Sequence, residues 1–512
     1  MSNFINQMDE YMNNFSITEN GAIAYKTSGK KLTDFNFKIS YYRDNPDMIE
    51  SDFVDLLEST DDIETIARYI FYIGDIREGL GERNIFRICL KKFFNYIDYK
   101  RVEKLISFIP EYNRWDSVWK IIIDDNELFD KAMIIINNQL ILDLYNASQS
   151  DKPISLLAKW MPSENASSKE TKLYAKKIRS WLNLSSKEYR LILSNLRKRL
   201  DIVERKISSN NWNEINYEYV PSRANIKYAN SFLKHDAERR KEYLDSLKKG
   251  KVKINYSVLY PYEIIDSYMK NEAPYNYFWV GFNAIKKTDD ALEEMWKALP
   301  KLNIKNTLVI RDGSGSMTSS VGNTSCLSVA SSLAIYLSEN NSGEWKDKFI
   351  TFSCNPKIVD LSKCETLREK INKSYREAEC SNTDIYKTMK LILNTAIKNK
   401  VSQEEMPEMI LIISDMQFDG SWFHMDGSLF DNIKKEFEFV GYKLPKICFW
   451  NVDGNIDNTI PLQENEYGLI LCSGFSINVV KMFLSDEINP YQILLDTLYN
   501  KRYNPIGEVF SK

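Results

Sequence analysis

The sequence has very few histidines and no long apolar run. Only two of its 512 residues are histidine, which argues against zinc sites built on histidine pairs and against mechanisms that use several histidines. No apolar run reaches the ~18 residues of a membrane-spanning helix, and even the segment 132–145 contains four polar residues. The first 14 residues are polar and acidic, unlike a secretory signal. We therefore expect no membrane association.

Cysteines are also sparse, and they are scattered. No close pair has the spacing of a zinc site or of a disulfide framework. This pattern predicts reduced thiols and a cytoplasmic protein. With 43% hydrophobic and 27% charged residues, the composition is that of a globular chain, and its length predicts two to four domains at about 150 residues each.

Charge is distributed in blocks, although the net charge is only −3. Residues 1–150 carry 17 lysines and arginines against 25 aspartates and glutamates, a net −8. Residues 401–512 carry 8 against 17, a net −9, whereas residues 151–250 carry 22 against 12, a net +10. A basic middle segment between acidic ends predicts a localised anion-binding surface.

Aromatic side chains lie among the cations of this basic segment. Bases stack on such rings while lysine and arginine meet phosphates, so the pattern predicts a nucleic-acid surface. The candidate contacts are Lys176, Lys177, Arg179, Arg197, Lys198, Arg199, Arg205, Lys206 and Arg223, with Trp160 and Trp181 as stacking partners. A solvated helix face over buried aromatics fits the same pattern.

The first half of the chain has helical periodicity. From residue 60 to about 205 apolar residues recur at helical spacing, as in Ile63, Ile66 and Ile70. The glycine-rich segment 74–83 (GDIREGLGER) lacks a Gly-Lys-Ser/Thr sequence, so we interpret it as a helix–helix turn capped by a glycine and not as a phosphate loop. These features predict an all-α domain of degenerate helical repeats over residues 1–300, with the basic segment inside it.

After Pro300 short apolar runs alternate with helical segments. Such runs predict buried strands of a mostly parallel sheet covered on both faces, a doubly wound α/β domain over residues 301–512. The predicted strands are 307–310, 349–352, 409–413, 447–450 and 468–472. In sheets of this kind ligands bind beyond the carboxyl ends of the strands.

Oxygen-bearing side chains follow two of these strands. Asp312, Ser314 and Ser316 form an Asp-x-Ser-x-Ser sequence after the first strand, and Asp415 follows the strand 409–413. Carboxylates with neutral hydroxyls suit Mg²⁺, which retains several waters. Such a site leaves the cation incompletely neutralised and favours a carboxylate from a partner. The alternative is that these residues only cap the following helix.

With this motif, residues 301–512 resemble a von Willebrand factor type A domain, a Rossmann-like fold. Its metal-ion-dependent adhesion site uses Asp-x-Ser-x-Ser, a later threonine and a later aspartate. The resemblance implies that Asp312, Ser314, Ser316 and Asp415 bind the metal, with Thr383 as the best match for the threonine. Gly313 departs from the apolar residue common at its position, which could loosen the loop.

The loop 417–427 follows Asp415 and should flank this metal. We expect its Trp422, Phe423 and His424 to form a partner-binding rim. Packing of these side chains onto the helix below is the alternative.

Over nearly its full length the chain also resembles a family of unknown function with members in plants, fungi, bacteria, phages and giant viruses. The segments that carry the resemblance are 75–83 (DIREGLGER), 112–116 (YNRWD), 158–164 (AKWMPSE), 203–206 (VERK), 221–223 (PSR) and 414–419 (SDMQFD). The layout is similar to that of the Ro autoantigen and TROVE proteins, in which a ring of HEAT-like repeats carries a von Willebrand A domain. Those proteins bind small noncoding RNAs and the ends of misfolded RNA, so the resemblance implies RNA binding by the helical domain.

Together these features predict a non-enzymatic RNA- or ribonucleoprotein-binding protein. RNA would lie on the helical domain, and an acidic group of a protein partner would bind Mg²⁺ on the A domain. The alternative is a metal-dependent protein-interaction scaffold without a nucleic-acid role. Phosphoester hydrolysis is disfavoured, because the site has one metal among hydroxyls without a nearby base. His424 is the only plausible base near that edge. If the source is a giant virus, packaging in the particle is a further expectation.

Overall fold

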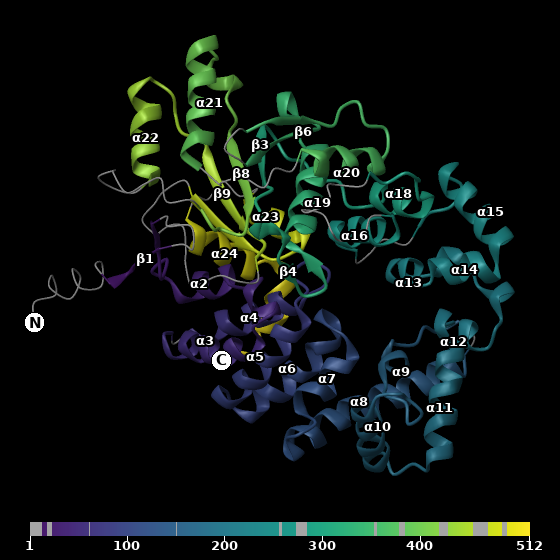
Figure 1. Cartoon of the computed structure of the whole chain (residues 1–512). Coiled ribbons are helices and arrows are strands. Elements are labelled where there is room, and N and C mark those ends of the chain that lie inside the picture. The colour runs from purple at the N-terminus through teal and green to yellow at the C-terminus, as the bar shows by residue number, and fades with distance from the viewer. Residues whose placement is uncertain are drawn as a thin grey trace, which may run out of the picture. The chain divides into compact units, whose positions relative to one another are not determined.

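The fold comprises two compact units built from interleaved parts of the sequence (Figure 1). A computed structural model describes residues 13–17, 23–60, 62–149, 151–254, 259–272, 284–352, 356–377, 385–418, 429–453, 469–483 and 489–511. Unit 1 comprises residues 1–61 and 259–498, and unit 2 comprises residues 62–258 and 499–512. Within the described ranges, no helix is long and apolar enough to cross a bilayer.

A six-stranded sheet forms the centre of unit 1 (Figure 1). In spatial order its strands are β10 (Leu469–Ser473), β9 (Lys446–Asn451), β8 (Met409–Ser414), β3 (Thr307–Asp312), β6 (Lys348–Phe352) and β7 (Ile358–Asp360). Neighbouring strands are parallel except β6 and β7. The five predicted strands and the mostly parallel sheet are thus confirmed. The edge strand β7 is not among the predicted strands, because its three residues form no apolar run.

Helices cover both faces of this sheet. Leu308 and Ile310 pack in one core with Met389 and Phe437, which lie on α21 (Ile385–Asn399) and α22 (Leu429–Phe439). On the other face, Nη1 of Arg311 donates to Oγ of Ser331 on α19 (Cys326–Glu339) at 3.3 Å. Because successive side chains of a strand point to opposite faces, the sheet is doubly wound. The remaining elements of unit 1 are β1 (Phe15–Ile17), β2 (Ile23–Tyr25), α2 (Lys31–Phe37), α3 (Pro46–Glu58), α16 (Pro261–Glu272), α18 (Asp290–Lys297), β4 (Ser320–Val321), β5 (Thr324–Ser325), α20 (Leu367–Arg376), α23 (Val480–Phe483) and α24 (Pro490–Leu498).

The N-terminal residues belong to this α/β unit, which differs from the predicted boundary at residue 300. Oγ of Ser40 donates to the carbonyl of Asn451 at 3.2 Å, and Nδ2 of Asn451 donates to the carbonyl of Phe37 at 3.0 Å. Residues 259–300 join the same unit, since Oγ of Ser328 on α19 donates to Asp266 on α16 at 2.5 Å. Both segments therefore pack within the α/β unit. Helical periodicity shows that a segment is helical, but it does not show which domain the helix packs against, so the predicted boundary was wrong.

Unit 2 is helical throughout its described residues. The aspartate N-caps Asp62, Asp98 and Asp125 each accept a hydrogen bond from the backbone of the first helical turn, as is typical of helix starts. The helices are α4 (Ile63–Gly74), α5 (Arg83–Phe93), α6 (Tyr99–Tyr112), α7 (Trp115–Ile122), α8 (Asn126–Ala147), α9 (Leu157–Trp160), α10 (Lys169–Trp181), α11 (Ser186–Arg199), α12 (Val203–Ser208), α13 (Ser222–Lys227), α14 (Ala229–His235), α15 (Ala237–Lys248) and α25 (Asn504–Gly507). The predicted helical region is confirmed, over the narrower range 62–258.

The glycine-rich segment 74–83 joins α4 to α5, as interpreted from the sequence, but the residue that caps α4 is Asp75 in an extended conformation and not a left-handed glycine. Gly81 has a φ of 71°, in the left-handed region that favours glycine. A Cβ at Gly79 would lie 2.0 Å from the carbonyl oxygen of Tyr72, so the close backbone packing also requires glycine there.

The C-terminal segment completes unit 2 through a charged contact with this turn. Asp75 is fully buried, and Nε of Arg502 donates to its Oδ2 at 2.8 Å. Nη1 of Arg502 donates to Glu111 at 2.8 Å, and the guanidinium lies 4.4 Å from the ring centroid of Tyr112. Burial raises the pKa of Tyr112 to about 12. The aspartate of the DIREGLGER segment therefore anchors the end of the chain.

Replacing Arg502 by alanine should destabilise unit 2 by about 3 kcal/mol, because it leaves the buried Asp75 carboxylate without its cation. Urea denaturation followed by tryptophan fluorescence measures this loss. Lys501→Ala is the matched control, since the Lys501 side chain is exposed. Equal stability of the two variants would show that unit 2 does not depend on this ion pair.

Candidate functional site

The sheet of unit 1 has a switch point between β3 and β8. From β3 the chain passes to β6 and β7 on one side, and it then returns to β8 on the other side. Open α/β sheets bind ligands at such a point, beyond the carboxyl ends of the strands. Asp312 is the last residue of β3, and Asp415 is the first residue after β8. The parallel register, which pairs Arg311 with Ile413, brings both aspartates to this edge.

The structure describes four of the five predicted metal ligands, Asp312, Ser314, Ser316 and Asp415. Oγ of Ser414 donates to Oδ2 of Asp312 at 2.6 Å, and the backbone N–H of Ser314 donates to its Oδ1 at 2.8 Å. The hydroxyl oxygens of Ser314 and Ser316 lie 3.0 Å apart. Asp312 is 0% exposed and Asp415 is 1% exposed. The fifth predicted ligand, Thr383, lies outside the described residues.

The carboxyl groups of Asp312 and Asp415 are both buried and interact, which makes it costly for both to be ionised. Burial and, second, the charge of Asp415 raise the pKa of Asp312 to about 7, although hydrogen bonds from Ser414 and Ser314 oppose the shift. Met416 follows with a φ of 64°, a left-handed conformation that is uncommon outside glycine. The turn it makes lets the N–H of Gln417 donate to Oδ1 of Asp415 at 3.2 Å.

Two further residues near this edge were not predicted from the sequence. Asp453 follows β9 and is 3% exposed, and Sγ of Cys326 donates to its Oδ1 at 3.6 Å. Burial, the charge of Asp453 and that of Asp415 all raise the pKa of the Cys326 thiol. The signal for Asp453 was present in the sequence, since it follows a buried strand just as Asp312 and Asp415 do.

The donor set fits a hard cation only if hydroxyls take part. Among the residues that the structure describes, no group of three or more His, Cys, Asp and Glu side chains is arranged to hold a metal. Carboxylates combined with serine hydroxyls form an all-oxygen set of the kind that suits Mg²⁺. Trp422, Phe423 and His424 of the predicted partner-binding loop lie outside the described residues.

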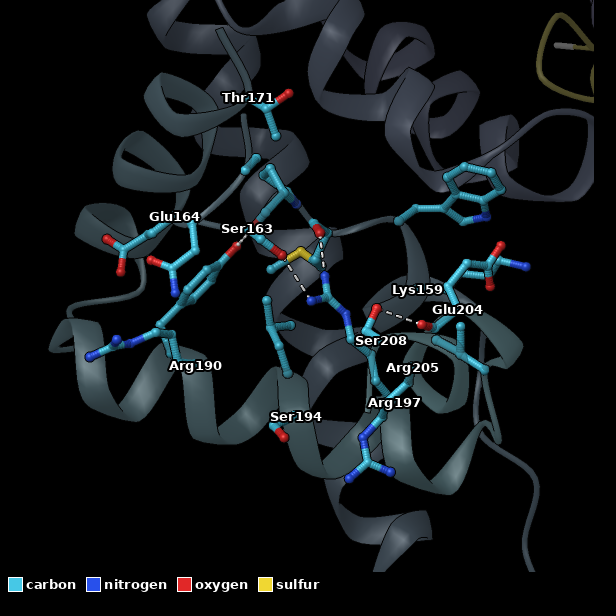
Figure 2. Close-up of a pocket in the computed structure, with 18 of the residues that line it drawn as sticks. Lys159, Ser163, Glu164, Thr171, Arg190, Ser194, Arg197, Glu204, Arg205 and Ser208 are labelled. Atoms are coloured by element: carbon cyan, nitrogen blue, oxygen red, sulfur yellow. Dashed lines mark hydrogen bonds between the residues drawn. The ribbon is translucent and has the colours of Figure 1, made fainter. Parts of the chain in front are cut away.

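Unit 2 contains a cavity of about 880 Å³ (Figure 2). Its walls come from the end of α9 and its connection to α10, from α11, from α12 and from Lys227 at the end of α13. Two of the segments that carry the family resemblance, 158–164 and 203–206, both contribute to its lining. The structure thus brings together motifs that are about forty residues apart in the sequence.

Several predicted RNA contacts make internal contacts instead. Arg197 has all three guanidinium nitrogens engaged, donating to the carbonyls of Ala158 and Met161 at 2.8 and 2.7 Å and to Oγ of Ser163 at 2.9 Å. Four other candidates also make internal contacts: Lys177 with the carbonyl of Ile123, Arg179 with Glu164, Lys206 with Asp201 and Trp181 with Asp130. These contacts favour a structural role for the five side chains.

The remaining candidates are accessible. The exposed cations are Lys176, Lys198, Arg199, Arg205 and Arg223, on α10 to α13. Trp160 is half-buried and lines the cavity, and the guanidinium of Arg114 lies 3.9 Å from its ring centroid. His235, in unit 2, is exposed and stacks on Trp212.

Comparison with known proteins places the chain near others of unknown function. Two family models match, each described as a domain of unknown function: DUF7788 over residues 306–496 and DUF2828 over residues 164–306. The chain is 29% identical to "Uncharacterized protein L728" of Acanthamoeba polyphaga mimivirus, with 97% of this chain and 89% of that protein covered. These matches agree with the predicted resemblance to a family of unknown function that includes giant-virus members.

Among solved structures the chain is similar to the Ro (RSR) protein of Deinococcus radiodurans. The two share 11% sequence identity with a TM-score of 0.42, over 90% of this chain and 93% of that chain. At this score the likeness carries no argument about function, so RNA binding has to be argued from the residues of this chain.

Arg197→Ala should lower the free energy of unfolding by about 2 kcal/mol, because it leaves three acceptors in the wall of the cavity without their donors. Lys198→Ala, at the exposed neighbouring position, should change it by less than about 0.5 kcal/mol. Chemical denaturation of both variants checks the pair. A surface role for Arg197 would instead leave both variants as stable as the wild type.

Proposed function

We propose that this chain is a non-enzymatic RNA-binding protein. Unit 2 would hold the RNA, and unit 1 would hold a divalent cation that takes an acidic group of a protein partner. The observation that carries the RNA proposal is the cavity of unit 2, whose lining has five cations against two carboxylates and includes the aromatic ring of Trp160. Single-stranded nucleic acids bind to such combinations of positive charge and aromatic surface.

The exposed cations Lys176, Lys198, Arg199 and Arg223 extend the positive surface beyond the cavity, which Arg205 lines. Lys198 and Arg205 form no side-chain hydrogen bond or ion pair within the described part of the chain, so each can meet a phosphate without losing an internal contact. This accessible charge lies in the segment 151–250, with its net +10. These accessible cations support binding along several nucleotides of an RNA strand and not only inside the cavity.

Binding of RNA by these cations should weaken steeply with salt. Each phosphate contact contributes about −0.7 to the slope of log K against log salt for a single strand. The double variant Lys198→Ala/Arg205→Ala should therefore reduce the slope by about 1.4. Fluorescence anisotropy with a labelled single-stranded RNA across a salt series measures both quantities.

Lys363→Ala, which removes an exposed lysine of unit 1, is the control and should leave the slope unchanged. Absence of binding by the wild type at low salt would contradict the RNA proposal.

The second part of the proposal is the cation site of unit 1, which we assign to a von Willebrand A domain. The strand order, with its antiparallel edge strand, and the meeting of Asp312, Ser314, Ser316 and Asp415 at the switch point support this assignment. Mg²⁺ or another divalent cation would be held there by carboxylate and hydroxyl oxygens and would supply a positive charge for a partner's carboxylate. The loop 417–427 with Trp422, Phe423 and His424 remains the predicted rim.

A non-enzymatic role stays a prediction. A cation held by carboxylates and hydroxyls needs a nearby base for hydrolysis, and His424, the one plausible base near this edge, lies outside the described residues. The HEAT-like repeat character of unit 2 and packaging in a virus particle stay predictions.

Mg²⁺ should stabilise unit 1 through Asp312. A ligand that binds only the folded state at 100 times its Kd adds about 2.7 kcal/mol to the free energy of unfolding. Asp312→Asn should abolish this gain. It should preserve the stability without metal, because it removes a like charge facing Asp415. Thermal unfolding with and without Mg²⁺ measures the gain, with Glu344→Gln as an exposed carboxylate control. An unchanged Mg²⁺ response in Asp312→Asn would rule out this site.

A further inference from the structure

The lining of the cavity of unit 2 has an excess of positive charge, five cations against two carboxylates. Four cations that line it, Lys159, Arg190, Arg205 and Lys227, form no ion pair with a carboxylate in the described structure. Of the two lining carboxylates, Glu164 is already engaged, since it accepts from Nε of Arg179 at 2.8 Å. Because a concave site concentrates the field of its charges, this cavity favours an anionic occupant.

The cations lie on two sides of the cavity and not at a single point. Figure 2 shows Arg190 on the side opposite Lys159 and Glu204. Arg190 belongs to α11, whereas Arg205 is on α12 and Lys227 ends α13. One compact anion such as inorganic phosphate is therefore a poorer match for both sides than a longer anionic chain. A chain of phosphates that crosses the cavity could contact both sides.

The aromatic ring in this cavity is held in place before any ligand arrives. The Arg114 guanidinium lies 3.9 Å from the ring centroid of Trp160. Arg114 is itself fixed by Asp116, to which its Nε donates at 2.7 Å and its Nη2 at 2.5 Å. A ring whose position is already fixed loses little conformational freedom when a base stacks on it, so Trp160 is suited to be a stacking platform.

Hydroxyl and amide groups complete the lining. Ser163, Asn165, Ser194 and Ser208 all contribute to the walls. Such groups donate and accept hydrogen bonds with sugars and base edges. A volume of about 880 Å³ lies within the range of sites that enclose small organic ligands. Positive charge, a fixed aromatic ring and uncharged polar groups together match the three parts of a nucleotide.

We propose that this cavity takes an unpaired nucleotide of the bound RNA, with its base against Trp160 and its phosphates near Lys159, Arg205 and Lys227. The next phosphates of the strand would pass toward Arg190. This inference rests on the proposed RNA-binding function and adds the class of RNA that is bound. A base inside a duplex must leave its stack to enter such a cavity, so the protein should bind single-stranded segments or ends more tightly than duplex.

The test compares a labelled RNA strand of mixed sequence with the same strand annealed to its complement. Wild-type protein should bind the single strand at least tenfold more tightly. Trp160→Ala should weaken single-strand binding by about tenfold, since stacking of one base is removed, and Trp160→Phe should restore most of the affinity. Arg205→Ala should reduce single-strand affinity more than duplex affinity. Lys176→Ala, an exposed cation outside the cavity, should weaken both complexes equally.

The outcomes separate this inference from the function on which it rests. If the wild type binds RNA but the Trp160→Ala and Arg205→Ala proteins lose no more affinity than Lys176→Ala, the cavity is not the nucleotide site, and the RNA-binding proposal stands. The same conclusion follows if duplex binds as tightly as single strand. If the wild type binds neither RNA, both proposals fail. Should Trp160→Ala unfold, as circular dichroism would show, the Trp160→Phe and Arg205→Ala results decide.

Discussion

The parallel pairing of β3 with β8 is the constraint on which the candidate site of unit 1 depends. These strands are far apart in the sequence, but their register places Asp312 and Asp415 at one edge of the sheet. Both strands are buried along their whole length, so neither can slip by one residue without turning its apolar side chains to the wrong face. The core of the sheet therefore fixes the position of two carboxylates that would otherwise repel each other.

The strands and most of the helices could be predicted from the sequence, because apolar runs and helical spacing are local signals. The boundary between the units could not be predicted in this way. It depends on contacts such as those of Ser40 with Asn451 and of Arg502 with Asp75, which join residues 411 and 427 positions apart. No periodicity encodes such pairings. Asp75 of the DIREGLGER segment could be singled out from the sequence, but its partner Arg502 could not.

The candidate sites show the same limit at the level of single side chains. Asp312, Ser314, Ser316 and Asp415 could be found because strand ends of a parallel sheet share one edge. The basic segment was harder to interpret, since a count of charges does not show which cations are already used. Arg197 and Lys198 are neighbours in the sequence, yet Arg197 holds the wall of the cavity while Lys198 is exposed. Only the packing of α9 against α11 distinguishes them.

We propose that the edge of the sheet binds a divalent cation between the ends of β3 and β8. Anomalous diffraction from crystals grown with Mn²⁺, an ion with similar oxygen ligands, can locate such a cation. We expect one strong anomalous peak in contact with oxygens of Asp312 and of the serines at 314 and 316, and we expect this peak to be lost in Asp312→Asn. A well-ordered edge without such a peak, or a peak bound only elsewhere in unit 1, would contradict it.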